Sequence, residues 1–319
     1  MAPLMKAAQI SEHDGAIELS IVELPRPEIG PDQVLVRVVG AGINPLDAKI
    51  RFGLTPKNLS VPLPFILGGD IAGVVEQAGP LIRRVKPGDR VFGRTHSLAG
   101  GGFAEFAAIR GDALAIAPTG ISLEHAAGIP AAAASAWAAL FDLGRLRAGQ
   151  SVLIHAAAGG VGSFAVQFAK LAGAHVTATC SAANFAMVRS LGADELIDYT
   201  AEDFVTRRRS LDLVLDSIGG ETEIRSLRVI RPGGMLVGLV RPPDEARAQE
   251  HLVRSRFLVL DQVGNNGARL QEIANWIDAG AVKLIVNKQV RLQQIDDALH
   301  LSRTGRVWGK IVVQIDAKA

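Results

Sequence analysis

The chain has 319 residues, a length that suits two domains rather than one ordinary core. It is 48% hydrophobic and 21% charged, which is typical of a packed globular protein and excludes a largely disordered chain. The net charge is only +2, and the densest basic run, Arg207 to Arg209, follows acidic Glu202 and Asp203. We therefore interpret that run as a solvated helix face and expect no nucleic-acid partner.

Cysteine usage and hydropathy predict the compartment. Cys180 is the single cysteine, so no disulfide can form within the chain, which is typical of a reducing compartment. The first residues show no charged-then-apolar signal pattern, and Gly, Pro, Arg or Asp interrupts every apolar run before it reaches the ~20 residues of a membrane helix. We therefore expect a cytoplasmic protein with no membrane partner.

Short apolar runs separated by Pro and Gly fill the first third of the chain. Runs of this length between such residues are typical of strands. The predicted strands are 34–39, 71–75, 90–92 and 103–109. Proline-rich pieces at 25–27 and 62–64 suit extended loops between strands. Residues 1–121 are therefore predicted to form a mostly β domain.

Near Ser122 the pattern changes to alanine-rich helix and then to regular alternation of strand and helix. The predicted strands are 151–155, 175–179, 195–199, 211–216 and 235–239. The helices predicted after the first two of these strands end at Gly173 and Gly192. Such alternation indicates right-handed βαβ units, so residues 122–264 are predicted to be an α/β domain with a Rossmann doubly wound parallel sheet.

The remaining residues, 265–319, contain two amphipathic helical stretches and two short strand candidates. The helices are predicted at 268–279 and 292–302, and the strands at 282–286 and 310–315. Two strands cannot make a sheet large enough for independent stability. We therefore expect this tail to return to the first domain, so that both chain ends build it.

The segment 151–162, SVLIHAAAGGVG, carries the clearest functional motif. An apolar strand precedes its glycines and a helix follows them, as in a dinucleotide-binding fingerprint, although Ala157 replaces the first glycine. Glycines let the backbone approach a pyrophosphate, and the first helical turn offers free N–H groups to phosphate oxygens. We predict a nicotinamide dinucleotide here, with a tight turn without ligand as the alternative. We expect His155, at the strand end, to be a hydrogen-bonded structural residue.

Residues after the next strand predict which dinucleotide binds. Selectivity for NAD uses an Asp or Glu about twenty residues past the glycine loop, where it binds the ribose 2′-OH. The corresponding residues here, 180–184, contain no acid, whereas Ser181 and Asn184 can donate to a 2′-phosphate and Tyr199 can reach the same pocket. We therefore predict NADPH as the cofactor. Ser181 is also suited to cap the following helix, a role compatible with the first.

Several motifs together make the chain resemble a known family over essentially its full length. They are Gly42-Ile-Asn-Pro-Leu-Asp-Ala-Lys49, Gly68-Gly-Asp-Ile-Ala-Gly-Val-Val75, Gly102-Phe-Ala-Glu-Phe106, the segment from Pro130 to Trp137, the glycine loop and Gly309-Lys-Ile-Val312. The chain resembles the zinc-free quinone oxidoreductase (zeta-crystallin-like) branch of the medium-chain dehydrogenase/reductase superfamily. The resemblance implies a GroES-like β domain from both chain ends and a Rossmann domain between them.

The resemblance also implies positions that contact the cofactor. They are Asn44, Ser135, Ala158, Gly159, Gly160, Val161, Ser181, Asn184, Tyr199, Ser217 and Ile218. The C-terminal residues Arg303, Arg306 and Lys310 lie where the tail meets the cofactor in some relatives, and the sequence does not decide among them.

No metal is expected. Zinc-dependent members of the superfamily need a thiolate, an imidazole and a third ligand, but Asn44 and Gly69 stand at the first two positions. Asp70 remains, and we expect it to fix the loop by hydrogen bonds. Without a Lewis acid, alcohol oxidation is disfavoured, whereas a quinone or α,β-unsaturated carbonyl compound accepts hydride readily.

The predicted function is therefore zinc-independent, NADPH-dependent hydride transfer to a quinone or enone. Asn44 would orient the nicotinamide or the substrate carbonyl, and Lys49 would hydrogen-bond or protonate the enolate; the alternative for Lys49 is a solvated side chain. The alternative function is a low-turnover NADPH-binding redox sensor or structural, crystallin-like protein. A homodimer is expected through 256–261, which we interpret as an apolar edge strand of the Rossmann sheet.

Overall fold

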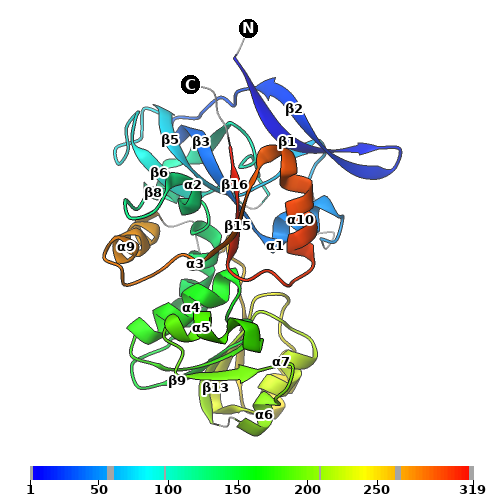
Figure 1. The fold of residues 1–319 in the computed structure, drawn as a ribbon, viewed down its shortest axis with the longest axis vertical. Coiled ribbons are helices and arrows are strands. Elements are labelled where there is room, and N and C mark those ends of the chain that lie inside the picture. Colours follow the sequence, from blue (N-terminus) through cyan, green and yellow to red (C-terminus); the bar gives the residue numbers. More distant parts are fainter. Residues whose placement is uncertain (1–2, 56–60, 97, 208–209, 263–266, 316–319) are drawn as a thin grey trace. The chain divides into compact units, whose positions relative to one another are not determined.

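The computed structural model describes residues 3–55, 61–96, 98–207, 210–262 and 267–315. The chain divides into two compact units (Figure 1). The first unit contains Met1–Ala131, Gly264–Ala281 and Val286–Ala319. The second contains Ala132–Val263 and Val282–Ile285. Each unit is built around its own sheet, so the two are described separately.

The first unit consists mainly of antiparallel sheet. A small sheet has the order β2-β1-β4, and a larger one has the order β15-β16-β3-β5-β6-β8, with β7 also pairing β3. The strands are β1 (Leu4–His13), β2 (Ala16–Pro25), β3 (Gln33–Ile43), β4 (Phe65–Ile66), β5 (Asp70–Ala78), β6 (Arg90–Arg94), β7 (Phe106–Arg110), β8 (Leu114–Ile116), β15 (Val286–Arg291) and β16 (Lys310–Gln314). The helices are α1 (Pro45–Arg51), α2 (Leu123–Ala126), α9 (Gly267–Asp278) and α10 (Ile295–Arg303), with short 3-10 turns at Gly111–Ala113 and Leu292–Gln294.

Both chain ends contribute to this first unit. Strand β16 pairs antiparallel with β3, so that Ile311 lies opposite Ile43. It also pairs in parallel with β15. The C-terminal strand therefore completes a sheet begun by the first third of the chain, and the predicted GroES-like β domain from both chain ends is confirmed as a fold class.

The second unit has a six-stranded parallel sheet of order β11-β10-β9-β12-β13-β14. The strands are β9 (Ser151–Ile154), β10 (His175–Cys180), β11 (Glu195–Asp198), β12 (Leu211–Asp216), β13 (Ile230–Gly238) and β14 (Arg254–Phe257). Numbered from β9, this is the order 3-2-1-4-5-6 of a doubly wound sheet, so the predicted Rossmann fold is confirmed. The helices are α3 (Pro130–Trp137), of which the first two residues belong to the first unit, α4 (Gly160–Leu171), α5 (Phe185–Ser190), α6 (Phe204–Arg207), α7 (Glu221–Ser226) and α8 (Glu245–Glu250), with a π-helix at Ala138–Leu143 and a 3-10 turn at Ala182–Asn184.

The unit boundaries differ from those expected at residues 121/122 and 264/265. Residues 122–131 belong to the first unit, because α2 packs directly on β3: a Cβ atom on Gly40 would lie 2.4 Å from the Glu124 carbonyl oxygen. Residues 282–285 belong to the second unit, where the Gln167 side chain donates to the Lys283 carbonyl and accepts from its amide. The second predicted boundary lies outside the described residues.

The last strand of the parallel sheet is shorter than expected and begins earlier. Strand β14 covers Arg254–Phe257, so the predicted strand at 256–261 is wrong in its bounds. The last hydrogen bond of the ladder with β13 is the one that the Leu258 amide donates to the Gly238 carbonyl. The strand is also less apolar than expected, because Arg254 and Arg256 are exposed. It is nevertheless the end strand in the sheet order of the described residues.

Candidate active site

The glycine loop follows β9 and starts α4 at the carboxyl edge of the parallel sheet. Ala156 has a φ of 49°, and the buried Ala157 donates its amide to the Thr179 carbonyl of the neighbouring strand. A Cβ on Gly162 would lie 2.4 Å from the Ala156 carbonyl oxygen, so only glycine permits this approach of helix to loop. Ala157, which stands in place of the first fingerprint glycine, is fully buried.

The start of α4 has the unpaired donors that a pyrophosphate requires. The Ser163 amide donates to the Gly159 carbonyl. The amides of Gly160, Val161 and Gly162, which precede Ser163 in the first turn of α4, have no acceptor within the helix, because the first amides of any α-helix lack an intrahelical partner. Such amides at a helix N-terminus attract phosphate oxygens through their hydrogens and the helix dipole. The loop thus fits the dinucleotide predicted from its sequence.

Ser181, Asn184 and Tyr199 follow the neighbouring strands β10 and β11, at the same edge of the sheet as the glycine loop. Strands β10 and β11 pair so that Cys180 lies opposite Asp198, which brings the next residues, Ser181 and Tyr199, to one edge. The Asn184 amide nitrogen donates to the Ser181 hydroxyl oxygen at 3.1 Å, and the Ser181 side chain makes no capping hydrogen bond. The hydroxyl proton of Ser181 is therefore available to a ligand, and Tyr199 is exposed.

Asp198 is an acid that the sequence reasoning overlooked at this edge. Its carboxylate accepts hydrogen bonds from the Thr200 amide at 3.0 Å and the Thr200 hydroxyl at 2.7 Å. These bonds lower the pKa of Asp198, so the group is ionised at neutral pH. Because both hydrogen bonds come from Thr200, Asp198 stabilises the loop that follows β11.

The loop after β12 completes this edge of the sheet. The Ser217 hydroxyl donates to the His155 carbonyl at 3.0 Å. Buried Asp216 accepts from the backbone amides of Ile218 at 2.8 Å and Gly219 at 3.0 Å. Ile218 is therefore held at the surface, where it is half exposed. The loops after β9 and β12 flank the point where strand order reverses, which is where ligands bind in doubly wound sheets.

His155 is a structural residue, as predicted. Its Nδ1 lies 3.0 Å from the Thr179 hydroxyl and its Nε2 lies 3.0 Å from the Ser226 hydroxyl. Burial lowers the pKa of His155 to about 3, and the charge of Arg225 adds to the shift. The neutral imidazole thus ties β9 to β10 and α7 and has no free nitrogen for a ligand.

In the first unit, Asn44 lies at the centre of a buried polar cluster. The Lys310 ammonium donates to the Asn44 side-chain oxygen at 2.6 Å and to the Ile43 carbonyl at 2.8 Å. The Asn44 side-chain nitrogen donates to Asp70 at 3.0 Å. Asp70 also accepts from the Ala131 amide at 3.1 Å and lies 3.8 Å from the Lys310 ammonium. Asp70 therefore fixes the loop by hydrogen bonds, as expected.

A second carboxylate of this cluster, Asp47, has an unusual titration. It is buried in α1 and accepts a 2.8 Å hydrogen bond from the backbone amide of Asn44, the residue that caps the start of this helix. Burial raises the pKa of Asp47 to about 7, and the negative charge of Asp70 adds to the rise. Asp47, Asp70 and Lys310 are absent from the predicted catalytic set, because a sequence does not show which charged residues become buried.

The remaining predicted residues have different surroundings. Lys49 is half-buried one turn along α1, and its ammonium makes no hydrogen bond or ion pair with any described residue. Ser135 is buried in α3. Of the three C-terminal candidates, Arg303 and Arg306 are exposed, whereas Lys310 is 5% exposed and engaged with Asn44. The structure therefore brings Lys310, rather than Lys49, into contact with Asn44.

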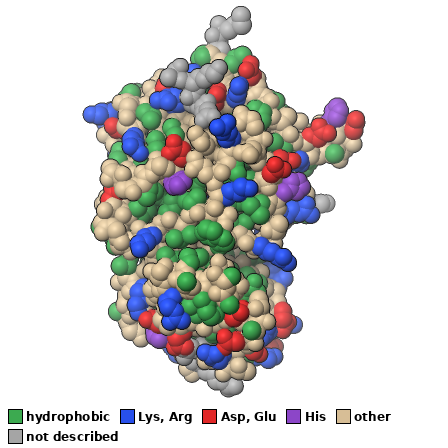
Figure 2. Space-filling model, viewed as in Figure 1, with side chains coloured by type: hydrophobic (Ala, Val, Ile, Leu, Met, Phe, Trp, Pro, Cys, Tyr) green, Lys and Arg blue, Asp and Glu red, His purple; other side chains and the backbone are tan. Residues whose placement is uncertain are grey.

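The described residues show no group of three His, Cys, Asp or Glu side chains that could hold a metal ion. Nor does any helix in the described part have the length and apolar character needed to cross a bilayer. On the face drawn in Figure 2, Lys and Arg side chains are interspersed with Asp and Glu.

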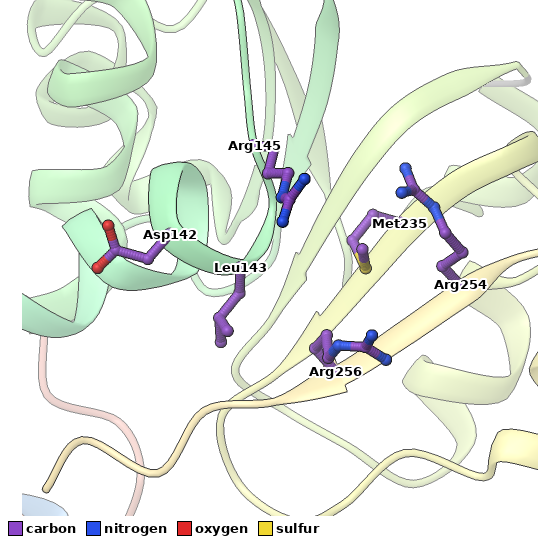
Figure 3. A pocket seen from close by; sticks show the side chains of 6 residues that line it. All are labelled: Asp142, Leu143, Arg145, Met235, Arg254 and Arg256. Carbon is purple, nitrogen blue, oxygen red and sulfur yellow. The ribbon is translucent and has the colours of Figure 1, made fainter. Parts of the chain in front are cut away.

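A separate pocket of about 300 Å³ lies in the second unit (Figure 3). Its lining residues are Asp142, Leu143, Arg145, Met235, Arg254 and Arg256. Met235 pairs with Arg254, the first residue of β14, and with Leu213 near the start of β12. The pocket therefore lies toward the amino ends of the strands, away from the glycine loop at their carboxyl ends.

Comparison with known proteins places this geometry in context. Residues 30–119 match the family described as alcohol dehydrogenase GroES-like domain, and residues 191–313 match that described as zinc-binding dehydrogenase. The NADPH-dependent alkenal/one oxidoreductase of Arabidopsis thaliana is 36% identical over 97% of this chain and 79% of its own. The 2-methylene-furan-3-one reductase of Solanum lycopersicum is 34% identical over the same shares. The solved quinone oxidoreductase from Coxiella burnetii, 30% identical, superposes with a TM-score of 0.89 over 98% of this chain and 99% of its own.

A GroES-like unit together with a Rossmann unit whose glycine loop has the dinucleotide-binding pattern is typical of a nicotinamide-dependent oxidoreductase. The chain belongs to the medium-chain dehydrogenase/reductase superfamily, in its quinone oxidoreductase branch.

Proposed function

We propose that the protein is an NADPH-dependent oxidoreductase that transfers hydride to a quinone or an α,β-unsaturated carbonyl compound. When bound, the reduced nicotinamide would supply a hydride, that is, a proton together with two electrons, to the acceptor. The observation that carries the proposal is the start of α4, whose first amides have no acceptor within the helix and which lies at the same edge of the sheet as the Ser181 hydroxyl. The relatives named for alkenal, alkenone and quinone substrates support the acceptor class.

Different residues of the chain would bind different parts of the cofactor and the substrate. The backbone of Ala158, Gly159, Gly160 and Val161 would hold the pyrophosphate. Ser181, Asn184 and Tyr199 would surround the 2′-phosphate, and Ser135, Ser217 and Ile218 would line the cofactor nearer the nicotinamide. Asn44 would contact the nicotinamide or the substrate, with Lys49 as the enolate-stabilising group.

A preference for NADPH over NADH of at least about tenfold in dissociation constant is the expected result for the wild type. One charge-assisted hydrogen bond from the Ser181 hydroxyl or the Asn184 amide is worth roughly 1.5–3 kcal/mol, and tenfold corresponds to about 1.4 kcal/mol. Titration calorimetry with each cofactor measures the ratio. Ser181→Ala should reduce the ratio while leaving NADH binding unchanged, because NADH has no 2′-phosphate. Equal constants for the wild type would contradict the assignment.

The acceptor class can be tested with a panel. NADPH oxidation would be followed with 1,4-benzoquinone, 9,10-phenanthrenequinone and a series of alkenals and alkenones. Turnover with members of either class supports the proposal. NADPH binding without turnover of any acceptor would favour the alternative, a low-turnover redox sensor or crystallin-like structural protein.

We also propose that this activity needs no zinc. The Lys310 ammonium already provides a cation beside Asn44 and Asp70, where it lies 2.6 Å from the asparagine oxygen. A divalent metal at that position would meet an amide and one carboxylate, without the thiolate and imidazole that zinc enzymes use. Activity that survives dialysis against a chelator, in protein without stoichiometric zinc by elemental analysis, is expected.

The oligomer proposed here is a homodimer joined along β14. The Leu258 amide donates to β13. Because successive backbone amides along a strand point to opposite sides, the Phe257 amide points toward the open edge of the sheet. Phe257→Pro should therefore remove one hydrogen-bond donor from the interface and give a monomer in sedimentation at micromolar concentration. Phe257→Ala, which keeps the amide, should stay dimeric. A wild-type chain that sediments as a monomer would contradict the dimer.

The compartment proposed is the cytoplasm. The support is that Cys180 is the single cysteine, so no disulfide can form within the chain, which is typical of a reducing compartment.

A further inference from the structure

Three strands bring distant charged residues to the Asn44 side chain. Strand β16 pairs with β3 so that Ile311 lies opposite Ile43, and the adjacent residues are Lys310 and Asn44. On the other side of β3, Gly42 lies opposite Asp70 of β5. Neither charged side chain is accessible: Asp70 is 0% and Lys310 is 5% exposed.

The two charged partners bind opposite ends of the same carboxamide. Lys310 donates to the Asn44 Oδ1 atom, and Asp70 accepts from the Asn44 Nδ2 atom. Rotating the amide by a half turn would direct its NH₂ group at the ammonium and its oxygen at the carboxylate. Both new contacts would be repulsive, because an ammonium has only donors and a carboxylate only acceptors. The ion pair therefore fixes which end of the amide is nitrogen.

The fixed amide retains one unused donor. A carboxamide nitrogen carries two hydrogens, and Asp70 accepts only one of them. Asn44 is partly exposed, so its second N–H can reach a ligand. Buried and paired charges hold such a group more firmly than solvent-exposed ones, since water does not compete for the hydrogen bonds.

We propose that Lys310 and Asp70 are positioning residues, which lock the Asn44 carboxamide so that its free N–H donates to a carbonyl oxygen of the substrate or nicotinamide. This inference rests on the proposed function in assigning that oxygen, but the locking itself is a property of the free protein. It also gives Lys310, a cofactor candidate from the sequence, a role that is exerted through Asn44.

The locking is tested first without any reaction. In protein labelled at asparagine nitrogen, the Asn44 side-chain amide signals are assigned by their loss in Asn44→Ala, and their hydrogen exchange is measured by NMR. Lys310→Met should speed this exchange by about tenfold or more, because without the lysine the Asn44 carboxamide can rotate and break its hydrogen bond to Asp70. Lys288→Met removes an exposed lysine from the neighbouring strand β15 and should leave the rate unchanged. Equal exchange in Lys310→Met and wild type would overturn the proposal, whatever the protein reduces.

The consequence for turnover is tested by a double-mutant cycle at saturating NADPH. Lys310→Met and Asn44→Ala should each lower kcat for an alkenone by about 30-fold, and the double variant should lose no more than either alone. If the loss of kcat in the double variant equals the product of the two single losses, Lys310 acts independently of Asn44 and the proposal is overturned. If the wild type reduces no acceptor, the proposed function fails while the exchange result still decides the positioning.

Removing one charge of a buried pair risks unfolding. Lys310→Met/Asp70→Asn removes both charges and serves as the second variant, with the same expected rise in exchange. If neither variant folds, as judged by thermal melting, the pair is a stability element and the positioning role is refuted.

Discussion

Lys49→Met should slow reduction of an enone by about 10²–10³-fold while leaving reduction of a quinone and the affinity for NADPH nearly unchanged. The enone becomes an enolate on receiving hydride, and a positioned ammonium stabilises charge that appears only then. A quinone needs little help from such a donor. The Lys49 ammonium has no hydrogen bond or ion pair among the described residues, so it is available for this role.

The measurement compares kcat and KM for one alkenone and one quinone, with NADPH binding measured separately by calorimetry. Lys49→Arg serves as a control that retains the positive charge and should keep part of the enone activity. An equal, small loss with both acceptors would assign Lys49 to the solvated helix surface, the alternative that its sequence left open.

Acid should destabilise the second unit through His155. Its folded pKa of about 3 lies below the ordinary histidine value of 6.5, so the unfolded chain binds the proton more tightly. The stability from the neutral imidazole is therefore complete above pH 6.5 and is lost as the pH falls toward 3. The slope is about 1.4 kcal/mol per pH unit, so roughly 2 kcal/mol is lost between pH 6 and 4.5 and roughly 4–5 kcal/mol by pH 3.

Amide hydrogen exchange of β9 and β10 between pH 6 and 4.5 measures this loss in the second unit alone. His155→Gln is less stable at neutral pH, because it loses a hydrogen bond to Thr179 or Ser226, but it should lack this part of the acid dependence. His175→Gln removes an exposed imidazole from the same sheet and should keep the wild-type dependence. Parallel curves for wild type and His155→Gln would show that protonation of His155 is not responsible.

The fold class was predictable because its signals are local. The alternation of strands and helices after Ser122 and the order of apolar strand, glycines and helix at 151–162 depend on neighbouring residues, and both appear in the structure. The Rossmann edge strand was misplaced because its apolar run, 257–260, continues past the last ladder hydrogen bond at Leu258. Helix α2 was assigned to the wrong unit because only packing shows that Gly40 accommodates it.

The sequence by itself determined the dinucleotide loop, the structural character of His155 and the polar residues after β10, since each follows from spacing along one βαβ unit. Only the tertiary structure decided the surroundings of Asn44. Lys310 is 266 residues away from it along the chain, and Asp70 is 26 away. Whether a lysine becomes a solvated surface group or a buried partner depends on strand register, which is set by the pairing of β3 with β16 on one side and with β5 on the other. A single sequence carries no local signal for that pairing.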